Sequence, residues 1–235
     1  MTTFALVHGA WHGAWCWDAV ARVLDDDGHE TVAVDLPCED PAASFDDYAD
    51  VVVRSLEGRS DDVVVVGHSL AGQTIPLVAA RRPVRALVYV CALLPSPGCS
   101  LRQLIEEQPD MLLPDYRAGL ELVDDQGTTR WCDDAVARQT FFADCDDDAA
   151  RAAIERLRPQ ATAPYALPCS LTALPAVPAT YVVCADDRLV NPEWSRLAAP
   201  AVAQRVVELP GGHSPFLSHP RDLVAVLTAA TPPAP

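Results

Sequence analysis

The sequence predicts an α/β fold: a doubly wound, mostly parallel six-stranded sheet with an inserted helical cap. Two observations predict the sheet. Short β-branched runs alternate with helical patterns along the chain, and these runs are continuously apolar, as parallel strands buried on both faces are. A third observation predicts the cap, because the alternation stops between Cys91 and Thr180, a stretch far longer than a crossover between strands needs.

Each predicted strand is a short run rich in valine and other apolar residues. The six runs are Phe4–Val7, Thr31–Val34, Val63–Val66, Ala86–Cys91, Thr180–Cys184 and Arg205–Leu209. The predicted helices of the core are Ala14–Leu24, Phe45–Leu56, Leu70–Arg81, Glu193–Ala199 and Asp222–Ala229. Sheets of this kind bind ligands at the carboxyl ends of their strands, so the residues that follow each strand are the candidates for chemistry.

Residues 1–91 and 180–235 are predicted to form the core, and residues 92–179 a mainly helical cap. The cap begins with a cluster of helix and strand breakers, Pro95–Gly98, and its last part is rich in proline. Inside it, helical patterns occupy Leu101–Glu107 and Ala149–Arg158, and no strand is expected.

Charge excludes several classes of partner and of chemistry. The 235 residues include 33 acidic and 17 basic residues, a formal net charge of −16. We therefore expect no nucleic-acid and no membrane partner, since both attract basic proteins. All the basic residues are arginine, and the lack of lysine excludes Schiff-base chemistry, a P-loop lysine and a lysine general base. Nothing in the sequence indicates an oligomeric state, and the proline-rich tail, Thr231–Pro235, is expected to fray.

The eight cysteines are scattered, and no two of them form a C-x-x-C pair. The chain passes from Met1 into its first strand without a basic leader, so we expect a cytoplasmic protein whose cysteines are reduced. Neither the cysteines nor the six dispersed histidines have the spacing of a metal site. The acidic runs Asp25–Asp27 and Asp146–Asp148 are interpreted as solvated helix ends or turns, because they lack the alternating spacing of a calcium loop.

The candidate nucleophile is Ser69, in the segment Gly67-His68-Ser69-Leu70-Ala71-Gly72. This G-x-S-x-A pattern follows a four-valine strand and precedes a helical run. Such a sharp strand-to-helix turn raises the serine hydroxyl into the crevice and leaves room only for small residues beside it. A short pattern of this kind is weak in isolation, and its position between strand and helix makes it informative.

A serine hydroxyl needs a general base, and that base needs an acid to orient it. The fifth predicted strand is followed by Asp186 and Asp187, and the sixth by Gly211, Gly212 and His213. The order serine, aspartate, histidine, each just after a strand, predicts a triad of Ser69, His213 and one of the two aspartates.

An acyl-transfer site also needs two backbone N–H donors that face the developing oxyanion. One donor is expected from Leu70, directly after the nucleophile and at a helix N-terminus. The other is expected from Ala10, in the loop after the first strand. His8 is expected to brace this loop through its ring nitrogens, and His68 to pack beside the Ser69 turn.

Several stretches together resemble the α/β-hydrolase superfamily, and within it the plant methylesterase and hydroxynitrile lyase group with its bacterial esterase relatives. The resemblance rests on residues 4–17, FALVHGAWHGAWCW, on the turn at 67–72 and on GHSPF at 212–216, and it extends over nearly the whole chain. It implies the α/β-hydrolase fold and a serine hydrolase that uses no cofactor. It also implies that the acid is Asp187, the aspartate directly before an arginine, with Asp186 as its solvated neighbour.

The departures from this group separate its two activities. The lyase members have a threonine where Gly9 stands and a lysine where Ser214 stands. The resemblance therefore implies that this chain does not cleave cyanohydrins by their route, and it favours the esterase branch. Ala71 replaces the usual glycine, which concerns only the fine shape of the turn.

Substrate contacts are expected from the cap and from the loop after the first strand. Among the apolar cap residues we expect Trp131, Phe141 and Leu112 to face the acyl group, although these side chains could instead form a small core of the cap. His12 could contact the substrate or brace its own loop. His29 and His219 are expected at the surface or in turns.

The main hypothesis is a serine hydrolase that cleaves a small, largely apolar carboxylic ester through an acyl-enzyme, with no cofactor and no metal. The first alternative keeps the same triad but acts as a cyclase, thioesterase or lyase on a biosynthetic intermediate. The second is a ligand-binding protein with a vestigial triad. An aspartate nucleophile, as in epoxide hydrolases and haloalkane dehalogenases of this fold, is excluded by Ser69.

Overall fold

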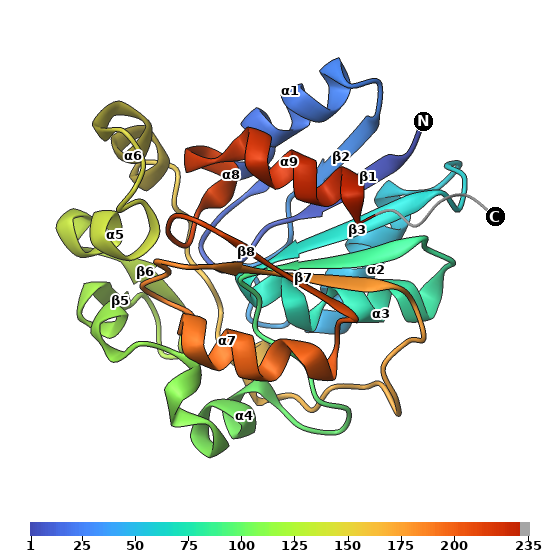
Figure 1. The fold of residues 1–235 in the computed structure, drawn as a ribbon. Coiled ribbons are helices and arrows are strands. Elements are labelled where there is room, and N and C mark those ends of the chain that lie inside the picture. Colours follow the sequence, from blue (N-terminus) through green and yellow to red (C-terminus); the bar gives the residue numbers. More distant parts are fainter. Residues whose placement is uncertain (231–235) are drawn as a thin grey trace.

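A six-stranded sheet forms the centre of the molecule (Figure 1), in a computed structural model that describes residues 1–230. The predicted fraying of Thr231–Pro235 lies outside the described residues. The strands are β1 (Thr3–Val7), β2 (Glu30–Val34), β3 (Val63–His68), β4 (Ala86–Val90), β7 (Ala179–Cys184) and β8 (Arg205–Leu209). They pair in the order β2-β1-β3-β4-β7-β8, and every pair is parallel. The predicted sheet and its six strands are confirmed.

The chain reverses its direction across the sheet between β1 and β3. It proceeds from β1 to β2 on one side and then returns to place β3 on the other side of β1. Connections that leave neighbouring strands in opposite directions open a crevice at their carboxyl ends, where doubly wound sheets bind ligands. The register pairs Val7 with Gly67, so the loop after β1 and the turn after β3 begin side by side at this crevice.

Helices cover both faces of the sheet. On one face, α1 (Asp18–Asp26), α8 (Pro215–Ser218) and α9 (Pro220–Ala229) lie together, as Figure 1 shows, and bury a cluster that includes Trp17, Leu24 and Leu223. The other face is covered by α2 (Phe45–Ser55), α3 (Ile75–Arg81) and α7 (Pro192–Ala198). The predicted core helices are therefore present, and two of them begin with a 3-10 turn, at Ala14–Trp17 and Ser69–Gln73.

The segment between β4 and β7 forms a separate group of elements, coloured green to yellow in Figure 1. It contains α4 (Leu101–Glu107), α5 (Asp134–Phe141) and α6 (Asp147–Ile154), with short 3-10 turns between them. It also contains an antiparallel hairpin of β5 (Leu120–Leu122) and β6 (Thr129–Trp131). The expectation that no strand occurs here was wrong, because three-residue strands are too short to show an alternating pattern.

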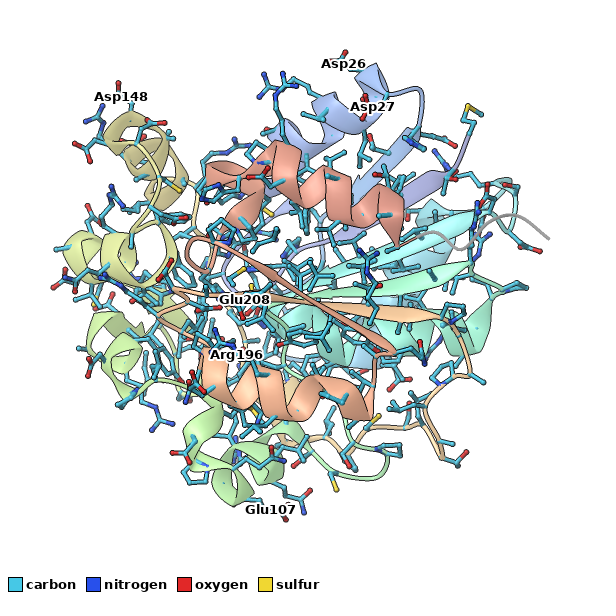
Figure 2. All side chains as sticks on the ribbon, in the orientation of Figure 1. Asp26, Asp27, Glu107, Asp148, Arg196 and Glu208 are labelled. Atoms are coloured by element: carbon cyan, nitrogen blue, oxygen red, sulfur yellow. The ribbon has the colours of Figure 1, made fainter. Side chains whose placement is uncertain are left out.

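The two acidic runs lie at helix ends, Asp25–Asp27 at the end of α1 and Asp146–Asp148 at the start of α6. Asp146 caps α6 by accepting a hydrogen bond from the Ala149 N–H at 2.8 Å, and Asp147 and Asp148 form ion pairs with arginines in the same segment. Figure 2 shows Asp148, Asp26 and Asp27 at the outer ends of their helices. None of the helices in residues 1–230 has the length and apolar character of a membrane span.

Candidate active site

Ser69 is the first residue of the 3-10 turn that follows β3, and its backbone is strained. Its φ angle is +52°, a conformation that a non-glycine residue adopts only where the surroundings enforce it. A Cβ atom at Gly67 would lie 2.6 Å from the Ile75 side chain, and one at Gly72 would lie 2.4 Å from the Leu93 carbonyl oxygen. Close packing on both sides therefore requires glycines at these two positions and holds the Ser69 side chain at the edge of a cavity.

His213 and Asp187 form a buried pair at the ends of β8 and β7. The His213 Nδ1 lies 2.8 Å from Asp187 Oδ2, and the two side chains are 0% and 1% exposed. The other carboxylate oxygen, Oδ1, accepts hydrogen bonds from the N–H groups of Leu189 and Val190 at 2.8 and 3.0 Å. These bonds keep Asp187 aimed at the ring, whereas Asp186 turns away and accepts a hydrogen bond from the Gly211 N–H at 3.2 Å.

The pairing leaves Nε2 of His213 free to act as a base. Because the Nδ1–H donates a hydrogen bond to Asp187, the ring of a neutral His213 is protonated at Nδ1 and has its free lone pair on Nε2. This atom is buried and makes no hydrogen bond with any described residue, Ser69 included. Catalytic hydrogen bonds are often absent or long before substrate binds, so the missing bond between Nε2 and the Ser69 hydroxyl is compatible with catalysis.

Two side chains donate hydrogen bonds to the main-chain carbonyl oxygen of His213. His68 Nε2 lies 2.8 Å from the His213 carbonyl oxygen and donates to it, and Cys91 Sγ donates to the same oxygen at 3.5 Å. The ligand atoms of these three residues lie within 4.8 Å of one another. The hydrogen bonds to the carbonyl oxygen and to Asp187 account for this proximity without a metal ion. Burial keeps the pKa of His68 well below its ordinary value, so its ring is neutral.

Cys91 is a functional candidate that sequence reasoning missed. Its φ angle is +37°, at the end of β4, and the side chain is buried beside the His213 loop. Its position as the last residue of the predicted strand Ala86–Cys91 was the only available signal, and a scattered cysteine is normally a small core residue.

The loop after β1 presents a backbone donor next to Ser69. Neither the Ala10 N–H nor the Leu70 N–H has an acceptor among the described residues, and both residues line the same cavity as Ser69. A Cβ atom on Gly9 would lie 2.8 Å from Ser69 Cβ, so the loop and the turn are in close contact. Unpaired N–H groups beside a nucleophile are the arrangement that an oxyanion hole requires.

His8 and His12 fix the conformation of this loop. His8 Nδ1 donates to the Gly9 carbonyl oxygen at 2.8 Å, while its Nε2 accepts a hydrogen bond from the Leu36 N–H at 3.0 Å. His12 Nδ1 donates to the Ala10 carbonyl oxygen at 2.8 Å. Burial lowers the pKa of His8 to about 4 and that of His12 to about 3, so both rings are neutral near pH 7.

A cavity of about 570 Å³ opens beside Ser69 and extends under the segment between β4 and β7. Its apolar and aromatic lining includes Trp11, Leu93, Leu112, Tyr116, Leu120 and Tyr165. Four charged residues reach its lining: Arg102, Glu106 and Arg117 are exposed, and Glu121 is partly buried on β5. The inner part of the cavity therefore suits an uncharged, largely apolar group.

Of the four residues expected to contact substrate, only Leu112 lines this cavity. Trp131 packs edge-on against Trp11, which does line it, with ring centroids 5.7 Å apart. Phe141 is 1% exposed and packs on the His213 ring at 5.6 Å. His12 is fully buried behind the loop. The sequence marked these side chains as apolar or chemically capable, but which of them face a cavity depends on the packing of the inserted segment.

Known proteins resemble this chain over most of its length. Residues 4–226 match the family model described as "Alpha/beta hydrolase family". The chain is 26% identical to Methylesterase 9 of Arabidopsis thaliana, over 95% of each chain. It is 30% identical to (S)-hydroxynitrile lyase of Manihot esculenta, over 61% of this chain and 62% of the lyase. The crystal structure of polyneuridine aldehyde esterase superposes with a TM-score of 0.85 at 22% identity, covering 99% of this chain and all of that one.

Proposed function

Because this chain belongs to the alpha/beta hydrolase family, we propose that it is a carboxylic ester hydrolase that uses Ser69, His213 and Asp187 and forms an acyl-enzyme. The observation that carries the proposal is the buried pair of His213 and Asp187, which leaves Nε2 of the histidine unbonded at the carboxyl ends of the strands. Relatives whose names are esterase or methylesterase support ester hydrolysis.

The first half of the reaction acylates the serine. His213 Nε2 takes the proton of the Ser69 hydroxyl as the Ser69 oxygen attacks the ester carbonyl. The Ala10 and Leu70 N–H groups donate to the oxyanion, and Asp187 stabilises the imidazolium that forms. His213 then returns the proton to the departing alkoxide, which leaves as an alcohol.

The second half releases the acid. Water attacks the acyl-enzyme while His213 accepts its proton, and the collapse of the second tetrahedral intermediate restores the Ser69 hydroxyl. His68 and His12 lie against this centre as neutral rings, because burial lowers the pKa of both. The only positive charge expected there is thus the transient one on His213, which faces Asp187.

We infer from the cavity that the substrate is a small, largely apolar ester. A volume of about 570 Å³ lies within the range of roughly 300–1,000 Å³ that is usual for sites of small organic ligands. Three of the four charged residues that reach the lining, Arg102, Glu106 and Arg117, are exposed, so the part of the substrate next to Ser69 should carry no charge.

A second candidate keeps the same residues but changes the reaction to that of a cyclase, thioesterase or lyase. The comparison that favours it is the 30% identity to a protein named (S)-hydroxynitrile lyase, which covers only part of either chain. A serine-directed fluorophosphonate should label the protein under both candidates. Rapid turnover of simple esters is expected only under the first.

The test is the turnover of p-nitrophenyl acetate and of a panel of aryl and alkyl methyl esters. Ser69→Ala should abolish both turnover and fluorophosphonate labelling. The matched control is Ser55→Ala on α2, where the serine hydroxyl donates to the Val52 carbonyl oxygen of the same helix, and it should keep full activity. Unchanged turnover by Ser69→Ala would exclude the proposed nucleophile. Absence of labelling in the unmodified protein would instead indicate a ligand-binding protein with a vestigial triad.

A further inference from the structure

We propose that Asp144, in the inserted segment, is a positioning residue for His213. Asp144 lies between α5 and α6, and its Oδ2 accepts a hydrogen bond from the Gly212 N–H at 3.0 Å. Gly212 directly precedes His213 in the chain. The inference rests on the proposed function, in which His213 is the general base.

Two carboxylates hold the backbone that leads into His213. The Gly212 N–H donates to Asp144, and the preceding Gly211 N–H donates to Asp186 Oδ2 at 3.2 Å. Hydrogen bonds from N–H groups to carboxylates are stronger than those between neutral groups. Asp186 belongs to the β7 loop that also carries Asp187, whereas Asp144 comes from the segment that covers the cavity. Asp144 therefore connects that segment to the catalytic histidine.

The glycine pair before His213 is shaped to admit this carboxylate. Gly211 has a φ angle of +93°, and a Cβ atom there would lie 2.4 Å from Asp144 Oδ2. A Cβ atom at Gly212 would lie 3.0 Å from Asp144 Oδ1. A side chain at Gly211 would displace the carboxylate, and one at Gly212 would require it to shift by a few tenths of an ångström. The Asp144 carboxylate therefore gives a steric explanation for the two glycines that precede His213.

His219 contacts the same carboxylate from the core. Its Nε2 lies 3.6 Å from Asp144 Oδ2, and its Nδ1 lies 3.5 Å from Asp222 on α9. The Asp144 side chain is only 22% exposed in this position. Asp144 is therefore held between the Gly211–Gly212 backbone and the His219 ring, which restricts it more than a free surface aspartate.

The end of α5 touches His213 at a second point. Phe141 packs on the His213 ring, with centroids 5.6 Å apart, and it is 1% exposed. The short stretch from Phe141 to Asp144 thus contacts both the ring of His213 and the backbone before it. Loss of the Asp144 bond should let the histidine loop shift, and a misplacement of about 1 Å can cost on the order of 100-fold in rate.

The test compares Asp144→Ala with Asp144→Asn in steady-state kinetics on an ester that the unmodified protein hydrolyses. Asp144 is not among the residues that line the cavity, so Asp144→Ala should lower kcat by about tenfold or more and leave KM nearly unchanged. Asp144→Asn keeps an oxygen acceptor for the Gly212 N–H and should restore most of kcat. The matched control is Asp147→Ala, which removes a neighbouring aspartate that pairs only with Arg138.

A second readout does not depend on activity. Hydrogen–deuterium exchange of a peptide covering residues 205–216 should be faster in Asp144→Ala than in the unmodified protein, and unchanged in Asp147→Ala. If Asp144→Ala does not fold, Asp144→Ser, whose hydroxyl is too short to reach the Gly212 N–H, takes its place in both measurements. Wild-type kcat together with wild-type exchange in these variants would overturn the inference. An unmodified protein that hydrolyses no ester would overturn the proposed function instead, and the exchange rates would still decide the role of Asp144.

Discussion

His8 fixes the peptide unit that carries the Ala10 N–H, because its Nδ1 donates to the Gly9 carbonyl oxygen at 2.8 Å. The Gly9 carbonyl group and the Ala10 N–H belong to one planar peptide unit, in which they point in opposite directions. Since the Leu36 N–H donates to His8 Nε2 at 3.0 Å, the proton of the neutral ring must be on Nδ1. The conformation of the proposed oxyanion donor, the Ala10 N–H, therefore depends on the tautomer of a buried histidine.

Substitution of His8 should lower both activity and stability. In His8→Ala the Gly9–Ala10 peptide is free to rotate, and we expect kcat to fall by about 10²-fold, the usual cost of losing one oxyanion donor. The buried Leu36 N–H also loses its acceptor, which should cost about 1–3 kcal/mol of unfolding free energy. Steady-state kinetics and urea denaturation measure the two effects. His29→Gln, far from the loop, should leave kcat unchanged, and equal kcat values for the two variants would contradict this role of His8.

Gly9 should tolerate no side chain. A Cβ atom there would lie 2.8 Å from His68 Nδ1 and 2.8 Å from Ser69 Cβ. Gly9→Ala should therefore displace either the loop or the Ser69 turn and lower kcat by about tenfold or more, with a smaller effect on KM. Gly58→Ala provides a comparison, because a Cβ atom meets nothing within 4 Å there, although its positive φ angle of +77° costs some stability. Full activity in Gly9→Ala would show that the close approach at this position is not needed for catalysis.

Leu112 and Trp131 should differ in their effect on substrate preference. Leu112→Trp places a larger side chain in the cavity and should lower kcat/KM for esters of bulky acids by about tenfold, with little change for p-nitrophenyl acetate. Trp131 packs behind Trp11 and does not line the cavity, so Trp131→Phe should leave the preference unchanged. The measurement is the ratio of kcat/KM for a bulky and a small ester in each variant. A larger change of this ratio in Trp131→Phe than in Leu112→Trp would reverse the assignment.

The buried histidines should make stability depend on pH. Burial lowers the pKa of His8 to about 4 and that of His12 to about 3, from an ordinary value of 6.5. Below pH 6.5 the unfolded chain binds protons at these rings while the folded chain does not, so the unfolding free energy falls as pH falls from about 6.5 to about 4. Each ring contributes a slope of up to about 1.4 kcal/mol per pH unit.

Urea denaturation at several pH values between 7 and 5 measures this slope. His12→Asn preserves a donor for the Ala10 carbonyl oxygen but cannot be protonated. It should therefore remove the contribution of one titrating group, up to about 1.4 kcal/mol per pH unit, from the slope of the unfolding free energy against pH. Equal stability at pH 7 and pH 5 in the unmodified protein would contradict the assignment of neutral, buried rings.

Sequence patterns predicted the sheet because a parallel strand buried on both faces must be apolar along its whole length. Runs such as Val63–Val66 show this directly, and the predicted strands agree with the observed ones to within one or two residues. The inserted segment was less predictable. α5 and the β5–β6 hairpin are short, and they pack on one another and on the core, so their patterns are weak.

The sequence by itself determined the order of the chemical groups along the chain: Ser69 after β3, Asp187 after β7 and His213 after β8. Parallel strands bring their carboxyl ends to one edge, so this order was enough to expect the groups together. The family resemblance already favoured Asp187 over Asp186, and the hydrogen bond between Asp187 and His213 Nδ1 agrees with that choice. Only the tertiary structure decided that Leu112 and not Trp131 lines the cavity, and that Asp144 reaches the Gly212 N–H. These outcomes depend on side-chain directions and on contacts between segments distant in sequence, which local residue patterns do not encode.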